Sequence, residues 1–267
     1  MLANELIKDS GKNQVITKTI YMPRNYVDDW HTHPWHQIIF PVKGLLQSSL
    51  GEDNFIVPHN GMLYVPSNTP HKSIAVTKTQ FLSIYINPVY AKAFPNESKS
   101  CAVMPFLKEL ILLLVHRDSV TYPDHMISNL LLVLNDQLLT AHNYKIPLLI
   151  PHDRRLNSIF TQLQQQPDLK LTLSDWARKV GASERTLSRI CVKEFNQSFS
   201  LWRQNVRLVL AIQLLEDNHP INRISLELGY TSDSAFIHAF KGLFNQTPAK
   251  YRKSCLLADP LIQKSSN

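Results

Sequence analysis

Apolar residues recur at helical spacing in two similar blocks within the C-terminal third of the chain. The first block spans residues 173–195 and is interrupted at Gly181, and the second spans 221–244 and is interrupted at Gly229. The two glycines are 48 residues apart, and the last apolar residues of the two blocks are 49 apart. A repeat that keeps its glycine and its apolar frame predicts one helix-turn-helix scaffold present twice.

The residues at the two turns are those that short connections between helices require. A helix that ends in a left-handed residue favours glycine, which Gly181 and Gly229 provide. Ser183 and Ser232 follow where the next helix needs a side-chain oxygen for its free backbone amides. Turns this short prevent antiparallel packing of the two helices and favour the geometry that places a second helix in a DNA groove.

Continuous helices are predicted around and between the two blocks. Residues 156–163 carry apolar side chains at helical spacing, and Thr172 with Asp175 forms a capping-box pattern that starts the next helix. Ser200–Asp217 is predicted as one helix that ends before Pro220. Its length would set the separation of the two reading helices, which must be about 34 Å to reach one face of a duplex.

The N-terminal half has a different period. From Val15 to Ile86, short β-rich runs are broken by turn residues, and several of the runs alternate apolar and polar positions. Seven strands are predicted, at residues 15–21, 36–44, 45–51, 54–58, 62–66, 71–76 and 80–86. Runs this short and numerous, with no helix between them, predict a closed or sandwiched antiparallel β architecture.

From Met104 to Ala141 the period changes to 3.6, which predicts two helices, at residues 104–118 and 124–141. Their apolar faces are broad enough to cover the β domain or to form a subunit interface, and the leucine spacing favours neither. The expected fold is therefore α+β in two domains. The expected parts are a β-barrel with a helical hairpin at 1–142, a linker at 143–152, an all-α domain with two helix-turn-helix units at 153–255 and a disordered tail at 256–267.

The formal charge of +7 is concentrated in the expected helical domain. Between Asp153 and Lys253 there are 15 Lys and Arg against 9 Asp and Glu, a net of +6, which leaves +1 for the rest of the chain. A basic excess in one domain is typical of phosphate binding. No run is long and apolar enough for a membrane span and the start has no apolar signal segment, so we expect a cytoplasmic protein without membrane partners.

Four sequence runs in and just after the two blocks resemble the AraC/XylS family of transcription regulators. They are W-A-x-x-V-G-x-S-x-R-T-L-x-R from Trp176 to Arg189, L-G-Y-x-S-x-S-A-F from Leu228 to Phe236, A-F-K from Ala239 to Lys241, and T-P-x-x-Y-R ending at Arg252. The resemblance covers about a third of the chain. It implies two helix-turn-helix units, joined by a rigid helix, that enter successive major grooves on one face of the duplex.

The resemblance also assigns DNA contacts by position. The base-reading candidates are Arg185, Ser188, Arg189, Ser234 and His238. The phosphate candidates are Lys193, Arg203, Arg207, Lys241 and Arg252. Arginine suits this role because its two donors match guanine in the major groove. Two residues depart from the family pattern, since His238 stands where arginine is frequent and Asn245 where glycine is frequent.

A second resemblance lies in the β domain, where His31, His33, Gln37 and His71 follow the spacing of the two cupin motifs. In cupins, the histidines and an acid at the position of Gln37 can surround a metal ion. Replacing the acid with an amide removes a charge that would offset a divalent ion. Two interpretations therefore stay open, a polar pocket for a small-molecule effector and a metal site formed by His31, His33 and His71. We expect no required cofactor.

These patterns favour a sequence-specific DNA-binding regulator, activator or repressor, whose cupin-like domain binds a small-molecule effector. Its expected partners are double-stranded DNA, the effector, a second copy in a homodimer and, if it activates, RNA polymerase. One alternative is a cupin-type metalloenzyme attached to a DNA-binding domain, against which the missing acid argues, so we expect no enzyme. The other is a constitutive regulator whose barrel only dimerises it. Two further histidines, His36 and His59, are expected to be exposed.

Overall fold

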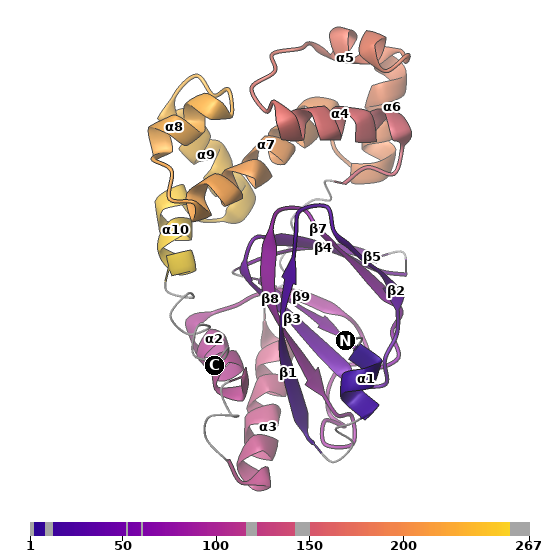
Figure 1. Cartoon of the computed structure of the whole chain (residues 1–267), viewed down its shortest axis with the longest axis vertical. Coiled ribbons are helices and arrows are strands. Elements are labelled where there is room, and N and C mark those ends of the chain that lie inside the picture. The colour runs from indigo at the N-terminus through magenta and orange to yellow at the C-terminus, as the bar shows by residue number, and fades with distance from the viewer. Residues whose placement is uncertain are drawn as a thin grey trace. The chain divides into compact units, whose positions relative to one another are not determined.

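A computed structural model describes residues 3–8, 13–51, 53–59, 61–115, 122–141 and 150–256 (Figure 1). They form two compact units, and the division falls between residues 145 and 146. This division lies inside the expected linker at 143–152, of which only 150–152 belongs to the described residues. Of the expected tail at 256–267, only the backbone of Leu256 is described.

The described part of the N-terminal unit contains nine strands in two antiparallel sheets. The strands are β1 (Val15–Met22), β2 (Val27–His31), β3 (His36–Lys43), β4 (Leu45–Leu50), β5 (Asp53–Pro58), β6 (Gly61–Val65), β7 (His71–Ala75), β8 (Thr79–Ile86) and β9 (Lys99–Ala102). One sheet has the order β1-β8-β3-β6-β9 and the other β2-β7-β4-β5. The seven predicted strands are all present, and β2 and β9 were not predicted.

Alternation along β3 shows how the sheets are layered. Ile38 and Phe40 belong to a core on the outer face of the five-stranded sheet, whereas Ile39 belongs to a core shared by both sheets. The shared core consists of Met22, Ile39, Leu46, Leu50, Val57, Leu63, Val65, Ala75 and Phe81. Because both faces of β3 are covered, nearly all of its residues are buried.

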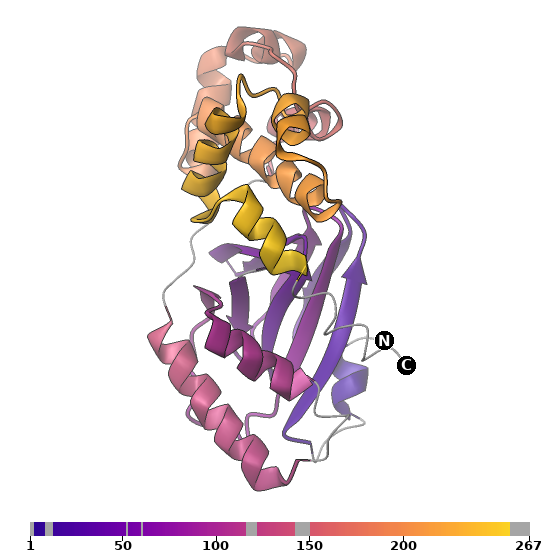
Figure 2. The ribbon, with the colours of Figure 1, turned by 90° about the vertical axis from the view of Figure 1, so that its left-hand side faces the viewer.

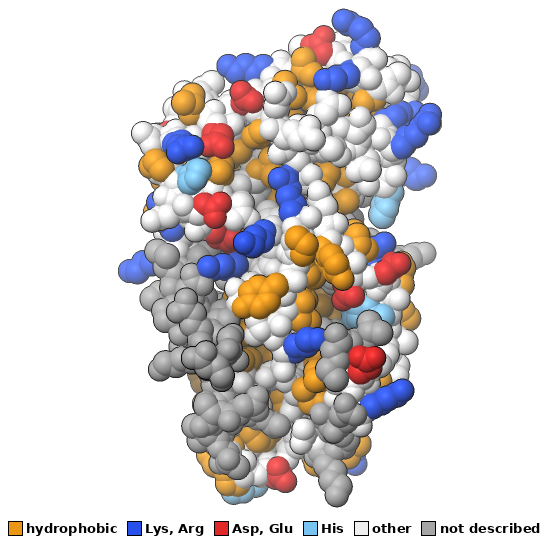
Figure 3. Space-filling model, in the orientation of Figure 1, with side chains coloured by type: hydrophobic (Ala, Val, Ile, Leu, Met, Phe, Trp, Pro, Cys, Tyr) orange, Lys and Arg blue, Asp and Glu red, His pale blue; other side chains and the backbone are white. Residues whose placement is uncertain are grey.

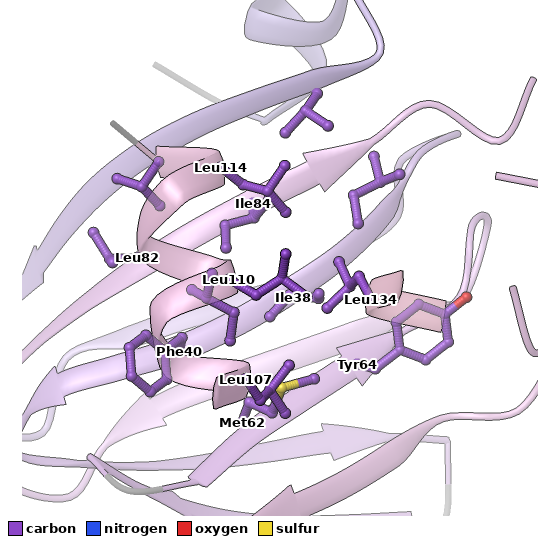
Figure 4. Packing of buried hydrophobic residues seen from close by; sticks show 14 of the residues in the cluster. Ile38, Phe40, Met62, Tyr64, Leu82, Ile84, Leu107, Leu110, Leu114 and Leu134 are labelled. Atoms are coloured by element: carbon purple, nitrogen blue, oxygen red, sulfur yellow. The ribbon is translucent and has the colours of Figure 1, made fainter. Parts of the chain in front are cut away.

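Two helices, α2 (Pro105–Val115) and α3 (Asp124–Thr140), lie against the outer face of the five-stranded sheet (Figure 2). Figure 4 shows Leu107, Leu110 and Leu114 of α2 directed at side chains of the sheet, among them Ile38 and Leu82. Each fully buried side chain of this size stabilises the fold by about 1.5–3 kcal/mol. The predicted helical hairpin therefore covers the β domain, which was one of the two arrangements that the leucine spacing left open.

A short helix that the sequence did not predict, α1 (Ala3–Lys8), packs near one end of the β domain. Its Ile7 is buried against Trp35 and Tyr85. The side-chain amide of Asn4 donates a hydrogen bond to the carbonyl of Thr32 at 3.0 Å. These contacts fix α1 beside the segment that joins β2 to β3.

The C-terminal unit is entirely helical in its described residues. Its helices are α4 (Arg154–Gln165), α5 (Leu173–Lys179), α6 (Glu184–Phe195), α7 (Phe199–Glu216), α8 (Ile221–Glu227), α9 (Asp233–Phe244) and α10 (Pro248–Leu256). Helix α7 packs against α4, α6, α8, α9 and α10. Its buried Trp202 stacks on Phe195 of α6, with ring centroids 5.6 Å apart. The predicted connecting helix is thus also the shared core of both helix-turn-helix units.

The turn residues predicted from the sequence are confirmed in both helix-turn-helix units. Gly181 and Gly229 have φ angles of +65° and +74°, the left-handed conformation that glycine adopts without strain. The Ser183 and Ser232 hydroxyls accept hydrogen bonds from the backbone amides three residues later, at 3.1 and 3.2 Å. Helix α5 begins with the predicted capping box, in which Thr172 serves as the N-cap. None of the described helices combines the length and hydrophobicity needed to cross a bilayer.

Candidate functional sites

One side of α6 carries three cations in line. Arg185, Arg189 and Lys193 are exposed and four residues apart, so they lie above one another along the helix. Ser188, half-buried, lies on the flank of this row. The opposite side of α6 is buried and includes Leu187 and Cys191, which fixes the direction in which the cations point. The structure therefore brings the predicted contacts of the first unit together on one surface.

Two acidic groups near this surface, Glu194 and Asp153, are occupied within the unit. The Glu194 carboxylate accepts backbone amide hydrogen bonds from His152 and Asp153 at 2.9 and 2.8 Å. Asp153 caps α4 and pairs with the Arg155 guanidinium at 2.7 Å, which lowers the pKa of Asp153 to about 2. Together with Arg189, Ile190 and Lys193, these three side chains line a hollow of about 350 Å³. In the described part of the chain, Arg189 and Lys193 make no ion pair, so both are available to an anionic ligand.

Helix α9 presents the corresponding surface of the second unit. Ser234, His238 and Lys241 are exposed at spacings of four and three residues, which places them on one side. The other side is buried through Phe236, Phe240 and Phe244. On the face of the helical domain that Figure 3 shows, the Lys and Arg side chains are interspersed with acidic ones and do not form one block. The predicted contacts of the second unit are therefore also brought together.

Both reading helices end in an asparagine. Asn196 after α6 and Asn245 after α9 adopt the left-handed conformation, with φ angles of +53° and +55°. Asparagine is one of the few residues other than glycine that tolerates this conformation. Asn245 therefore meets the conformational requirement of a position where glycine is frequent in the family.

Three of the phosphate candidates have partners within the unit. The guanidiniums of Arg203 and Arg207 donate to the backbone carbonyls of Leu171, at 2.5 Å, and Leu169, at 2.9 Å. That of Arg252 donates to the carbonyl of His219. Both guanidiniums are half-buried, and this burial lowers the pKa of Arg203 and Arg207, but both stay cationic. These bonds fasten α7 and α10 to neighbouring loops, a role that the sequence did not indicate, and their phosphate contacts stay a prediction.

Three histidines converge in the N-terminal unit. His31 ends β2 and lies opposite His71 at the start of β7, and His33 follows in the next loop. The ring centroid of His71 is 4.2 Å from that of His31 and 5.1 Å from that of His33. One ring nitrogen of each histidine lies within 4.8 Å of those of the other two. The structure thus assembles the predicted histidine group from two strands and a loop.

Backbone carbonyls orient the three rings. Nδ1 of His31, His33 and His71 lies 2.7, 2.8 and 2.8 Å from a main-chain carbonyl oxygen. A nitrogen at that distance from a carbonyl carries the proton, so in a neutral ring of His31 or His71 Nε2 carries the lone pair. Burial lowers the pKa of His33, and that of His71 to about 4. Both rings are therefore neutral at neutral pH.

The side-chain amide of Gln37 connects the histidines to the inner wall of the β domain. Its Oε1 lies 3.1 Å from His33 Nε2, and its Nε2 donates a hydrogen bond to the Ser83 hydroxyl at 2.6 Å. Because His33 Nδ1 also faces an oxygen, a neutral His33 ring donates to only one of the two. Ser48 and Ser73 form a second hydroxyl pair at 2.8 Å, and Tyr85 packs edge-on against the His33 ring. These hydroxyl residues were not predicted from the sequence, although they occupy the inward positions of their strands. This buried wall suits a polar ligand.

The expectation that His36 and His59 are exposed was wrong, because both are buried. His36 lies on the outer side of β3, where Phe94 covers it, and its Nδ1 accepts a hydrogen bond from the Ser67 amide at 3.0 Å. Burial lowers the pKa of His59 to about 3. Neither belongs to the three-histidine group.

Comparison with known proteins matches both units. Residues 15–163 match the AraC-like ligand binding domain, and residues 176–254 match a helix-turn-helix domain. The HTH-type transcriptional regulator NimR of Escherichia coli (strain K12) is 28% identical over 221 residues, which cover 83% of this chain and 81% of NimR. The HTH-type transcriptional activator RhaR of Mannheimia succiniciproducens is 23% identical over 237 residues, covering 83% and 86%.

A solved structure, ToxT from Vibrio cholerae O395, aligns with a TM-score of 0.40 and 12% identity over 91% of this chain and 98% of ToxT. The regulatory protein SoxS of Escherichia coli (strain K12) is 28% identical over 102 residues. They cover 38% of this chain but 95% of SoxS.

Proposed function

The chain belongs to the AraC family of transcriptional regulators, and from this premise we propose that both of its helix-turn-helix units read one continuous DNA site. The observation that carries the proposal is the pair of exposed polar faces on α6 and α9, built on the shared helix α7. A helical bundle whose polar faces only contacted solvent would not need the same turn, the same caps and the same outward polar face twice.

The contacts that we propose divide into base reading and positioning. Arg185 and Arg189 would meet base edges in the first groove, since arginine donates two hydrogen bonds to guanine. Ser234 and His238 would do so in the second groove, where serine contacts are less specific for one base. Lys193 and Lys241 lie further along the same helices and suit phosphate oxygens.

Control by an effector follows from the N-terminal unit. The polar inner wall beside the histidines offers hydroxyl, amide and imidazole groups to a small molecule. A ligand changes DNA affinity only if it binds differently to the two functional states. We therefore propose a regulator with an effector, and not a constitutive regulator whose barrel only dimerises it.

A homodimer is supported by the second face of α3. Its Ile127, Leu131 and Leu134 are buried in the unit, whereas Leu132 and Leu139 are exposed by 58% and 57%. These two exposed leucines are seven residues apart, the repeat of a helical seam. Met126 and Val133, also exposed, extend this apolar face with the same interval. We propose that a second copy of the chain covers it.

We propose that the protein acts on DNA in the cytoplasm and catalyses no reaction. Its matched relatives are transcriptional regulators. The position that a cupin acid occupies is held by Gln37, which is neutral and cannot serve as a general base. If the regulator is an activator, RNA polymerase is its further partner.

Selection of bound genomic fragments with the purified full-length protein, followed by footprinting, tests the proposal. We expect protection of two adjacent helical turns on one face of the duplex. Variants with Arg185 and Arg189 changed to alanine should lose the protection of one turn first, and variants with Ser234 and His238 changed should lose the other. Protection of a single turn in the wild type would contradict the two-unit reading.

A further inference from the structure

The three-histidine group has the organisation of a metal site. We propose that His31, His33 and His71 bind one divalent transition-metal ion through their Nε2 atoms. The inference rests on geometry, because the ring nitrogens of the group lie within 4.8 Å of one another. An ion bound at about 2.0–2.1 Å from each imidazole nitrogen needs nitrogens no more than about 4.2 Å apart, so the rings would have to move together slightly to hold it.

His71 provides the first independent observation. Its side chain is only 1% exposed, and its Nε2 has no hydrogen-bond partner. A buried polar atom without a partner costs free energy, and native structures rarely retain one without a reason. The lone pair of this nitrogen faces the other two histidines, where a cation would satisfy it.

The backbone around the rings provides the second observation. Each Nδ1 is held by a main-chain carbonyl, from Asp29, Trp35 and Thr69. Metal-binding histidines almost always donate their other ring N–H to such an acceptor, which fixes the tautomer and the direction of the free nitrogen. Loops that only packed three histidines together would not need to orient all three in the same sense.

A carboxylate lies beside the group, although not where the sequence motif would place it. The Asp28 carboxylate is 4.0 Å from His31 Nε2. Asp28 is paired with Ser73 across β2 and β7, on the same pair of strands that carries His31 and His71. We therefore assign to Asp28 the charge compensation that Gln37 cannot give.

The donor set selects the class of ion. Three imidazole nitrogens with one nearby carboxylate suit zinc, nickel, cobalt or copper, whereas magnesium and calcium prefer oxygen ligands. Binding must replace the contact between His33 Nε2 and the Gln37 amide, which leaves Gln37 on Ser83. Three protein nitrogens leave a coordination position open for water, Asp28 or an effector.

The regulatory part of this inference rests on the proposed function. An ion held by β2, β7 and the loop that joins β2 to β3 would fasten these segments together. If the DNA-bound and free states differ in this arrangement, the ion shifts operator affinity, and operator binding shifts metal affinity by the same factor.

The test uses tag-free, full-length protein that has been stripped with a chelator and dialysed. Cobalt(II) titration followed by visible absorption, with zinc(II) competition, measures stoichiometry, affinity and ligand geometry. We expect one ion per chain. His71→Ala and His31→Ala should each weaken binding by more than the roughly 10- to 100-fold that loss of an outer partner costs. Asp28→Asn should weaken it within that range, and Gln37→Glu should tighten it.

His125→Ala is the matched control, because it removes an exposed histidine of the same unit from α3. Circular dichroism checks that each variant is folded, and His31 is partly exposed, so its variant keeps the test valid if His71→Ala unfolds. Binding that is absent in the wild type, or that His31→Ala and Asp28→Asn leave unchanged, would overturn the inference. Operator binding is measured on the same samples to separate the two proposals. If the protein binds no operator either with or without metal, the proposed function is contradicted. If it binds the operator but binds no metal, only the metal site is disproved.

Discussion

The Ser225 hydroxyl of α8 donates a hydrogen bond to the carboxylate of Asp233 in α9, and this bond ties the two helices of the second helix-turn-helix unit together across their turn. Ser225 is buried, and Asp233 lies at the start of the reading helix. Asp233 is half-buried and accepts this bond on the side of α9 that faces α8, so it supports α9 from behind.

Ser225→Ala should lower the free energy of unfolding by about 1–2 kcal/mol, because a charge-assisted hydrogen bond is lost and Asp233 keeps no partner there. Asp233→Ala and the double variant complete a cycle, and we expect a coupling energy of about 1 kcal/mol. Urea unfolding followed by circular dichroism measures all three. A coupling energy of zero would show that the bond contributes nothing.

Arg189→Ala should weaken binding to the selected DNA site by about 1–3 kcal/mol and leave binding to random DNA nearly unchanged, because base contacts carry specificity. Lys193→Ala, one turn along the same helix, serves as the comparison. Lys193→Ala should weaken binding to the selected site and to random DNA equally. It should also lower by about 1 the slope of log affinity against log salt concentration, as expected of a phosphate contact. Fluorescence anisotropy over a salt series distinguishes these outcomes, and equal losses for Arg189→Ala would make it a phosphate contact.

The two turn glycines should differ in their tolerance of alanine. Gly181→Ala should cost about 1–2 kcal/mol, because only left-handed backbone strain is added and a Cβ there meets open space. Gly229→Ala should cost about 1–3 kcal/mol more, since its Cβ would lie 3.0 Å from Asp168 Cα, a backbone atom. Thermal unfolding of the two variants gives the comparison. Equal shifts in Tm would argue against the close approach of the Asp168 segment to the second turn.

Asp153 should make stability depend on pH in the acid range. Its pKa is about 2 in the folded chain, below the value of about 3.9 of an unfolded aspartate. The unfolded state therefore binds the proton first, and the stabilisation present above pH 4 is lost as the pH falls towards 2. Asp153→Asn keeps a good N-cap but removes the charge, so it should destabilise by about 1 kcal/mol at pH 7 and much less near pH 2. Urea unfolding at several pH values checks this, and a constant difference would contradict it.

Leu132→Glu with Leu139→Glu should convert a homodimer into monomers, because two charges would enter an apolar interface. Both leucines are exposed in the single chain, so we expect its folding to be unaffected. Analytical ultracentrifugation with and without DNA measures the change. Leu131→Glu, on the buried side of the same helix, is the contrasting variant and should unfold the N-terminal unit. A double variant that stays dimeric would place the interface elsewhere.

Features encoded by neighbouring residues could be predicted from the sequence. Gly181 and Gly229 with their following serines specify the turns locally, and the structure confirms each of them. The strand β3 was recognisable because an apolar run marks burial on both faces. In these places the signal and its physical cause lie within a few residues of each other.

Features that depend on distant partners could not be predicted in this way. Strand β2 reads VDDWH and is mostly exposed, so only its hydrogen bonds to β7 define it as a strand. The guanidiniums of Arg203 and Arg252 reach carbonyls 32 and 33 residues away. His36 looked like a surface residue because the ring that covers it, Phe94, is supplied by another part of the fold.

Because α7 contributes side chains to the cores of both helix-turn-helix units, the spacing between the two halves of the proposed DNA site would be encoded in the protein as a number of helical residues. One residue added to the middle of α7 would advance everything after it by about 1.5 Å and rotate it by about 100°. The second reading helix would then face away from the duplex, although its own residues were unchanged. Evolution of a new operator spacing in this scaffold would therefore require repacking of α7, whereas a new operator sequence at the same spacing requires only exchanges on the exposed faces of α6 and α9.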